Sequence, residues 1–155
     1  MSQESTASGI CTGMHRLSED DREFASAFFG CRIPAGEFGH REHLRMAYIC
    51  LAETDPEIAF QTLRNGLLAF LEHHGAGPDK YHETLTRAWL IVVRQCMEKT
   101  PDAESAEAFL GRHPELADRD LLRVHYSRER LFSDEARRSF TPPDRAPFPG
   151  AGNRR

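Results

Sequence analysis

Three histidines at the beginnings of two expected helices have the types and spacing that could do chemistry. His40 and His43 fall in an expected helix over about 38–53, where a helical wheel places both in the apolar stripe. His82 falls near the centre of the apolar stripe of an expected helix that begins after Asp79 and reaches Lys99. Buried imidazoles need polar partners, so three of them on core-facing stripes favour a metal site or acid–base chemistry over packing alone.

Connectivity predicts that these histidines meet. The expected linkers are short, so consecutive helices should run antiparallel. His40 and His43 begin the second helix, His74 ends the third and His82 begins the fourth, which places all four at one end of a bundle. His125 shares a stripe with nearby leucines and could close the same pocket from another helix.

The preferred interpretation is a three-histidine metal site made by His40, His43 and His82, with an open position for water, oxygen or substrate. The expected ion is divalent, zinc or iron, with nickel or manganese as alternatives. Glu37 or Glu83 could complete a two-histidine, one-carboxylate set for iron, although a salt bridge to Arg87 is the competing role for Glu83.

A small-molecule substrate is the expected partner, and the chain is expected to be an enzyme. The residues assigned to catalysis or substrate orientation are His82, Arg41, Thr86 and Tyr126, and the expected apolar walls are Phe38, Tyr48, Tyr81 and Trp89. Two alternatives stay open. One is a metal-free lyase or isomerase in which neutral His82 acts as the base. The other is a non-enzymatic module that binds a metal or ligand and docks through its proline-rich tail.

Start and stop signals predict an all-α helical bundle of four main helices plus shorter C-terminal helices. Ser18 is expected to cap the first helix, and Pro56 after Asp55 to begin the third. A fifth helix is expected from Thr100 to about 112, and shorter ones follow from 113 to 126 and after Ser133. The expected divisions are a disordered N-terminus over 1–16, a single helical domain over 17–140 and a proline-rich tail over 141–155.

Composition restricts the class of protein. The 155 residues are 39% hydrophobic with a net charge of −4, and Asp and Glu (24) outnumber Lys and Arg (20), which argues against nucleic acid as a partner. No apolar run approaches the roughly 20 residues that span a bilayer, and no secretory signal is visible, so no membrane and a cytoplasmic location are expected. The four cysteines show no C-x-x-C spacing, and Cys96 is expected to be a reduced core residue. His113 is expected to be structural or exposed, and homo-oligomerisation stays open.

Three motifs carry a resemblance to known proteins: Phe38-Gly-His-Arg-Glu-His-Leu-Arg45, Tyr81-His-Glu-Thr-Leu-Thr-Arg-Ala-Trp89 and Val124-His-Tyr-Ser127. Together they resemble a small family of bacterial all-helical proteins over most of residues 38–140. The resemblance implies one helical domain and no particular reaction. The chain is also loosely similar to DinB-like metal-binding bundles, which have four helices and three histidines, but it lacks the H-x-x-x-H expected there on a late helix.

Overall fold

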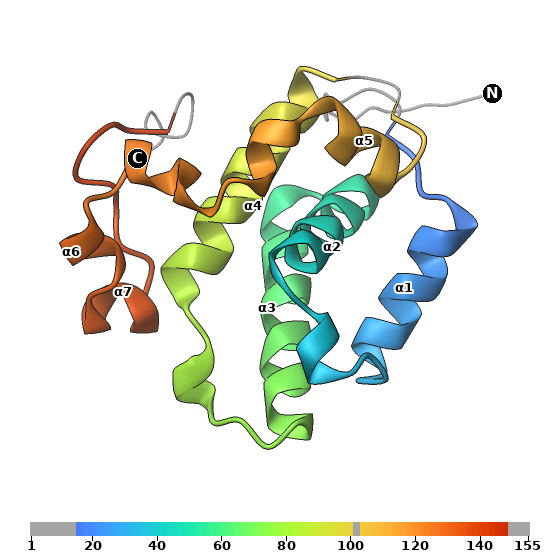
Figure 1. Cartoon of the computed structure of the whole chain (residues 1–155), viewed down its shortest axis with the longest axis horizontal. Coiled ribbons are helices and arrows are strands. Elements are labelled where there is room, and N and C mark those ends of the chain that lie inside the picture. The colour runs from blue at the N-terminus through green and yellow to red at the C-terminus, as the bar shows by residue number, and fades with distance from the viewer. Residues whose placement is uncertain (1–14, 101–102, 149–155) are drawn as a thin grey trace.

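The computed structural model describes residues 15–100 and 103–148, and all regular secondary structure in these ranges is helical (Figure 1). The all-α prediction is therefore confirmed. The four main helices are α1 (Glu19–Phe29), α2 (His40–Glu53), α3 (Pro56–His73) and α4 (Glu83–Glu98). The shorter α-helices are α5 (Ala106–Arg112), α6 (Arg128–Leu131) and α7 (Asp134–Arg138). The 3-10 helices are η1 (Ala35–Glu37), η2 (Pro78–Lys80), η3 (Pro114–Ala117) and η4 (Arg119–Val124).

The helix starts show which sequence signals acted as expected. Ser18 caps α1 in a capping box with Asp21, and the Asp55 carboxylate accepts a hydrogen bond from the Ile58 amide at the start of α3. The fourth helix begins later than expected, because His82 rather than Asp79 is its N-cap residue. The fifth begins at Ala106 after a Ser105 cap rather than at Thr100.

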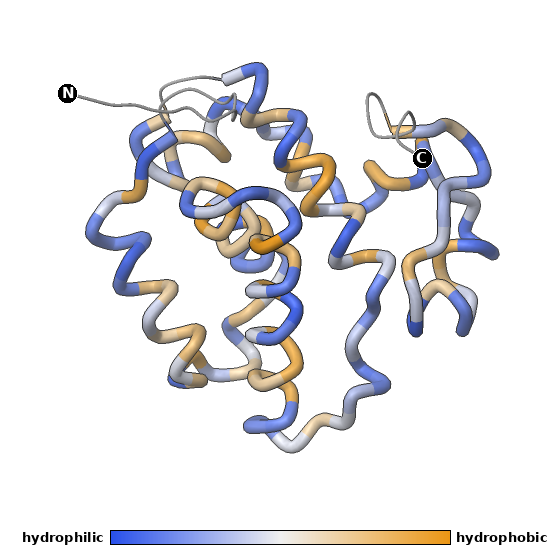
Figure 2. Tube along the Cα trace, turned by 180° about the vertical axis from the view of Figure 1, so that it is seen from behind, coloured by the Kyte–Doolittle hydropathy of each residue, from blue (hydrophilic) through white to orange (hydrophobic). Residues whose placement is uncertain are grey.

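Helix α2 packs against α3 and α4 and also contacts α1 and α5, so it is the centre of the bundle (Figure 1). Hydrophobic and hydrophilic residues alternate along the long helices (Figure 2), as expected of helices that bury one face. The core side chains of this region include Phe28, Leu44, Tyr48, Leu63 and Val93, which are all buried. Among the described residues, no helix has both the length and the apolar character needed to cross a membrane.

A buried carboxylate joins three of these helices. Asp21 in α1 is only 1% exposed and accepts hydrogen bonds from the backbone amides of Ser18 (3.0 Å) and Ala106 (2.9 Å). The Arg45 guanidinium of α2 also donates to it at 3.3 Å. The bonds to several donors satisfy the charge of this carboxylate and link α1, α2 and α5.

The segments expected to flank the domain pack against it where the structure describes them. Residues 141–148 have no helix, but Phe148 is buried and the Tyr126 hydroxyl donates to the Thr141 carbonyl at 2.6 Å. At the other end, the His15 ring hydrogen-bonds the Met97 carbonyl at 2.7 Å. The compact region therefore extends beyond the expected 17–140, and the rest of the expected disordered N-terminus and of the tail lies outside the described residues.

Candidate functional site

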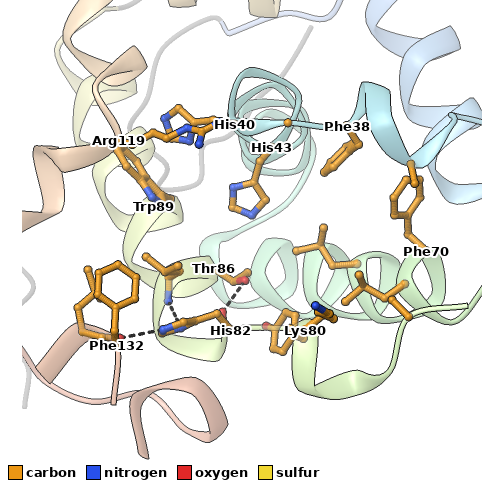
Figure 3. Close-up of a pocket in the computed structure, with 18 of the residues that line it drawn as sticks. Phe38, His40, His43, Phe70, Lys80, His82, Thr86, Trp89, Arg119 and Phe132 are labelled. Atoms are coloured by element: carbon orange, nitrogen blue, oxygen red, sulfur yellow. Dashed lines mark hydrogen bonds between the residues drawn. The ribbon is translucent and has the colours of Figure 1, made fainter. Parts of the chain in front are cut away.

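One cavity of about 800 Å³ lies where α2 and α4 begin and α3 ends, with η2, η4 and α6 completing its wall. Its volume falls in the range of small-molecule sites. His40, His43, His74 and His82 all line it, so the structure brings together the four histidines that connectivity placed at one end. Figure 3 labels His40, His43 and His82 in this cavity. We refer to this cavity as the histidine pocket.

Most of the lining is apolar, and three of the four aromatic residues expected as walls belong to it. The apolar side chains are Phe38, Leu67, Phe70, Leu71, Tyr81, Leu85, Trp89, Leu131 and Phe132. Tyr48 is the exception. Its hydroxyl donates to the Arg16 carbonyl at 2.9 Å, and its ring stacks on Phe109, so it belongs to the core elsewhere along α2.

His82 uses both ring nitrogens to hold the fold. Its Nδ1 accepts a hydrogen bond from the Leu85 amide at 3.1 Å, which caps α4. Its Nε2 therefore carries the proton and donates to the Leu131 carbonyl of α6 at 2.8 Å. Burial lowers the pKa of His82 from its ordinary value, so the ring is neutral, as expected from the sequence. Neither nitrogen is free for a metal or a substrate proton, which leaves His82 a structural role.

His40 is also bound by the backbone. Its Nε2 donates to the Leu116 carbonyl of η3 at 2.8 Å. The ring lies edge-on against Trp89, with 4.6 Å between the ring centroids. His40 therefore fixes η3 and one wall of the histidine pocket.

His43 is different, because its ring has no hydrogen-bond partner among the residues that the structure describes. Figure 3 shows this ring in the space between His40 and Trp89 on one side and His82 and Thr86 on the other. Burial, followed by the nearby His40, lowers the pKa of His43 to about 4. Near neutral pH the pocket thus contains one neutral imidazole with a free donor and a free acceptor.

The structure does not assemble the expected three-histidine metal site. Over residues 15–100 and 103–148, the one group of three potential ligands whose ligand atoms lie within 4.8 Å of one another is Cys96, His113 and Glu115. A group of a different composition that could hold a metal ion is therefore present in this part of the chain. No pattern in the sequence indicates this group, because Cys96 and His113 lie on separate elements without a ligand-type spacing.

The residues expected to orient a substrate have other roles. Thr86 lines the histidine pocket, but its hydroxyl donates to the His82 carbonyl of its own helix at 2.9 Å. Tyr126 is fully buried outside the pocket and donates to Thr141. Arg41 is exposed and is not part of the pocket lining. Arg41 and Tyr126 therefore do not line the histidine pocket, in contrast to the expected arrangement.

Of the other residues considered for the site, one lines the histidine pocket and three do not. His74 joins the pocket, with its ring against Phe70. His125 does not, since its Nδ1 is hydrogen-bonded to the Ala146 carbonyl at 2.7 Å. Glu37 is exposed outside the lining. Glu83 forms an ion pair at 3.0 Å with Arg64 of α3, instead of the expected pair with Arg87.

Several polar groups of the pocket have no hydrogen-bond partner among the residues that the structure describes. His74 Nε2, Tyr81 Oη and Arg123 Nε are buried without a hydrogen bond, and all three residues line the histidine pocket. Lys80, Arg119 and Arg128 line it as exposed cations, and no ion pair involves them among the described residues. The lining contains one carboxylate, Asp120, which lies 3.7 Å from Arg123. The pocket therefore combines apolar walls with a positively charged rim.

No protein-family model, curated protein or solved structure matches the chain. The pocket and its side chains are therefore the basis for a functional assignment.

Proposed function

We propose that the histidine pocket binds a small molecule that has an apolar body and one anionic group. The observation that carries this proposal is a set of buried polar atoms without hydrogen-bond partners among the described residues, inside an otherwise apolar cavity: His74 Nε2, Tyr81 Oη and Arg123 Nε. The half-buried ring of His43 also lines this cavity. Buried polar atoms in folded proteins nearly always have a hydrogen-bond partner. A bound ligand, together with ordered water, would supply the partners that the described part of the chain lacks.

The charges at the rim define the ligand further. Lys80, Arg119 and Arg128 have no ion pair among the described residues, and Asp120 is compensated by Arg123. A carboxylate or phosphate at the mouth would gain from three unneutralised cations, and guanidinium groups fit such anions well. The apolar walls would then cover the hydrocarbon part of the same molecule.

Proton transfer by His43 is the second candidate function, and its free, neutral ring favours it. A general base works best when its pKa lies near the working pH. With a pKa of about 4, His43 is deprotonated at neutral pH but holds an abstracted proton weakly. The gap between this pKa and neutral pH favours hydrogen bonding to a ligand over catalysis as the role of His43.

The chain offers a direct test, because Trp89 is its one tryptophan and lines the pocket. Decanoate, decanol and decylammonium share a chain length and differ in charge, so each would be titrated while Trp89 fluorescence is recorded. We expect saturable 1:1 binding that is tightest for decanoate. Each exposed cation is worth roughly 0.3–1 kcal/mol, so Arg119→Ala should weaken decanoate binding about two- to fivefold.

Arg138→Ala is the matched control, since Arg138 is also an exposed arginine but lies outside the pocket. It should leave decanoate affinity unchanged, whereas His43→Leu should weaken it. Equal affinity for decanoate and decanol, or equal effects of Arg119→Ala and Arg138→Ala, would show that the proposed anion site does not exist.

A further inference from the structure

A second group of chemically reactive side chains lies at the far end of α4 from the histidine pocket. Cys96 in the last turn of α4 follows His82 by 14 residues, which is about 21 Å along a helix. His113 at the end of α5 and Glu115 in η3 lie against it. The Glu115 Oε2 is 3.1 Å from His113 Nδ1 and 3.9 Å from Cys96 Sγ.

We propose that Cys96, His113 and Glu115 form a zinc site with one coordination position left for water. A thiolate, an imidazole and a carboxylate are a ligand set suited to Zn²⁺, which is borderline in softness and prefers tetrahedral geometry.

The distances between the ligand atoms match that geometry. Bonds of about 2.3 Å to sulfur and about 2.1 Å to nitrogen or oxygen give tetrahedral edges of about 3.6 Å from S to O and about 3.4 Å from N to O. The observed separations of 3.9 and 3.1 Å each differ from these values by about 0.3 Å, so small side-chain adjustments suffice.

The other ring nitrogen of His113 has the partner that a metal-bound histidine needs. Thr100 Oγ1 is in direct hydrogen-bond contact with His113 Nε2, and Thr100 is buried. Without metal, His113 Nδ1 donates a proton to the Glu115 carboxylate. When zinc takes the place of that proton, the ring keeps its proton on Nε2, where the Thr100 hydroxyl oxygen can accept it, and the Nδ1 lone pair is directed at the metal. Such outer hydrogen bonds fix the tautomer and orientation of zinc-bound histidines.

Burial differs across the group in a way that leaves the fourth position accessible. Cys96 is 8% exposed, whereas the side chain of Glu115 is 51% exposed. Zinc would therefore be reached from the Glu115 side, where water completes the coordination. On binding, the Cys96 S–H bond breaks, an S–Zn bond forms and the thiol proton passes to solvent. The proton between His113 Nδ1 and Glu115 also leaves Nδ1, either to solvent from a protonated ring or by a change of tautomer to Nε2. The ion would join the end of α4 to the junction of α5 and η3.

Cobalt(II) and zinc titrations of the full chain, freed of metal by chelator dialysis, test the site. We expect one Co²⁺ per chain, with a near-ultraviolet thiolate-to-cobalt charge-transfer band and the intense visible bands of tetrahedral cobalt, and its displacement by Zn²⁺. Cys96→Ser should abolish the charge-transfer band, whereas Cys31→Ser, which removes a more accessible cysteine outside the group, should keep it.

Zinc affinity, measured by competition with a chromogenic chelator, gives a second readout. His113→Gln and Glu115→Gln should each weaken zinc binding at least tenfold, and Thr100→Val should weaken it about tenfold through the ring orientation of His113. Because Glu115 is exposed, Glu115→Gln should fold, and it tests the zinc site even if Cys96→Ser fails to fold. A charge-transfer band retained in Cys96→Ser, no 1:1 binding by the wild type, or unchanged affinity in Glu115→Gln would overturn the proposal. None of these outcomes bears on ligand binding in the histidine pocket.

Discussion

The burial of His43 predicts how the stability of this protein changes with pH. Folding lowers the pKa of His43 from 6.5 to about 4, so the folded state disfavours the proton that the unfolded chain binds. Stability from this group is therefore fully present above pH 6.5 and is lost as the pH falls towards 4. Proton linkage with these two pKa values lowers the free energy of unfolding by about 2 kcal/mol from pH 7 to pH 5 and by about 3 kcal/mol by pH 4.

The assay is urea denaturation, followed by the fluorescence of Trp89, at pH 7, 6, 5 and 4 in buffers of equal ionic strength. His43→Leu removes the titrating ring. Between pH 7 and pH 5, the free energy of unfolding of this variant should therefore fall by about 2 kcal/mol less than that of the wild type. Any constant effect of the leucine on stability cancels in this difference. His73→Gln is the matched control, because His73 is exposed and lies outside the pocket.

Two results would refute the reasoning. If the wild type and His43→Leu lose the same stability between pH 7 and pH 5, the ring of His43 is not held neutral by burial. If His73→Gln flattens the pH dependence as much as His43→Leu does, the effect belongs to surface charge and not to the pocket.

Substitutions at four positions test the fold by their effect on the free energy of unfolding. Asp21→Ala removes the buried carboxylate and should cost about 3 kcal/mol, with a smaller loss for Asp21→Asn, which keeps an acceptor. A Cβ at Gly66 would lie 2.7 Å from the Phe28 ring, so Gly66→Ala should destabilise the fold by about 1–3 kcal/mol. A Cβ at Gly111 meets nothing within 4 Å, so Gly111→Ala should stabilise the helix by about 0.5–1 kcal/mol. His82→Ala should cost about 2 kcal/mol, and His82→Asn should recover about half of that by restoring the cap; equal losses would contradict the capping role.

Helix periodicity and connectivity were enough to predict that the histidines of α2, α3 and α4 lie around one pocket. The start signals at Ser18 and Asp55 acted as expected because capping depends on a few neighbouring residues. The convergence of His43, His74 and His82 follows from the direction of each stripe and the order of the helices, and neither needs exact boundaries.

Contacts between separate elements could not be predicted in this way. Glu83 and Arg87 have the spacing of an ion pair within one helix, but each pairs with α3, Glu83 with Arg64 at 3.0 Å and Arg87 with Glu57 at 3.1 Å. The register of α3 against α4 decides these partners, and no pattern along a single helix contains that register. The Cys96, His113 and Glu115 group depends in the same way on how η3 folds back onto the end of α4.

A related reason explains why His40 and His82 hydrogen-bond to the backbone instead of forming the expected metal site. An imidazole on a core-facing stripe can bind a metal, or it can donate to a backbone carbonyl that a short helix leaves unpaired at its end. His40 donates to Leu116 in the one-turn helix η3, and His82 donates to Leu131, the last residue of α6. Helices of four residues have too little periodicity to be placed from sequence, so their free carbonyls cannot be identified from the sequence alone. His43 meets no such helix end, and both nitrogens of its ring consequently stay open to a molecule in the pocket.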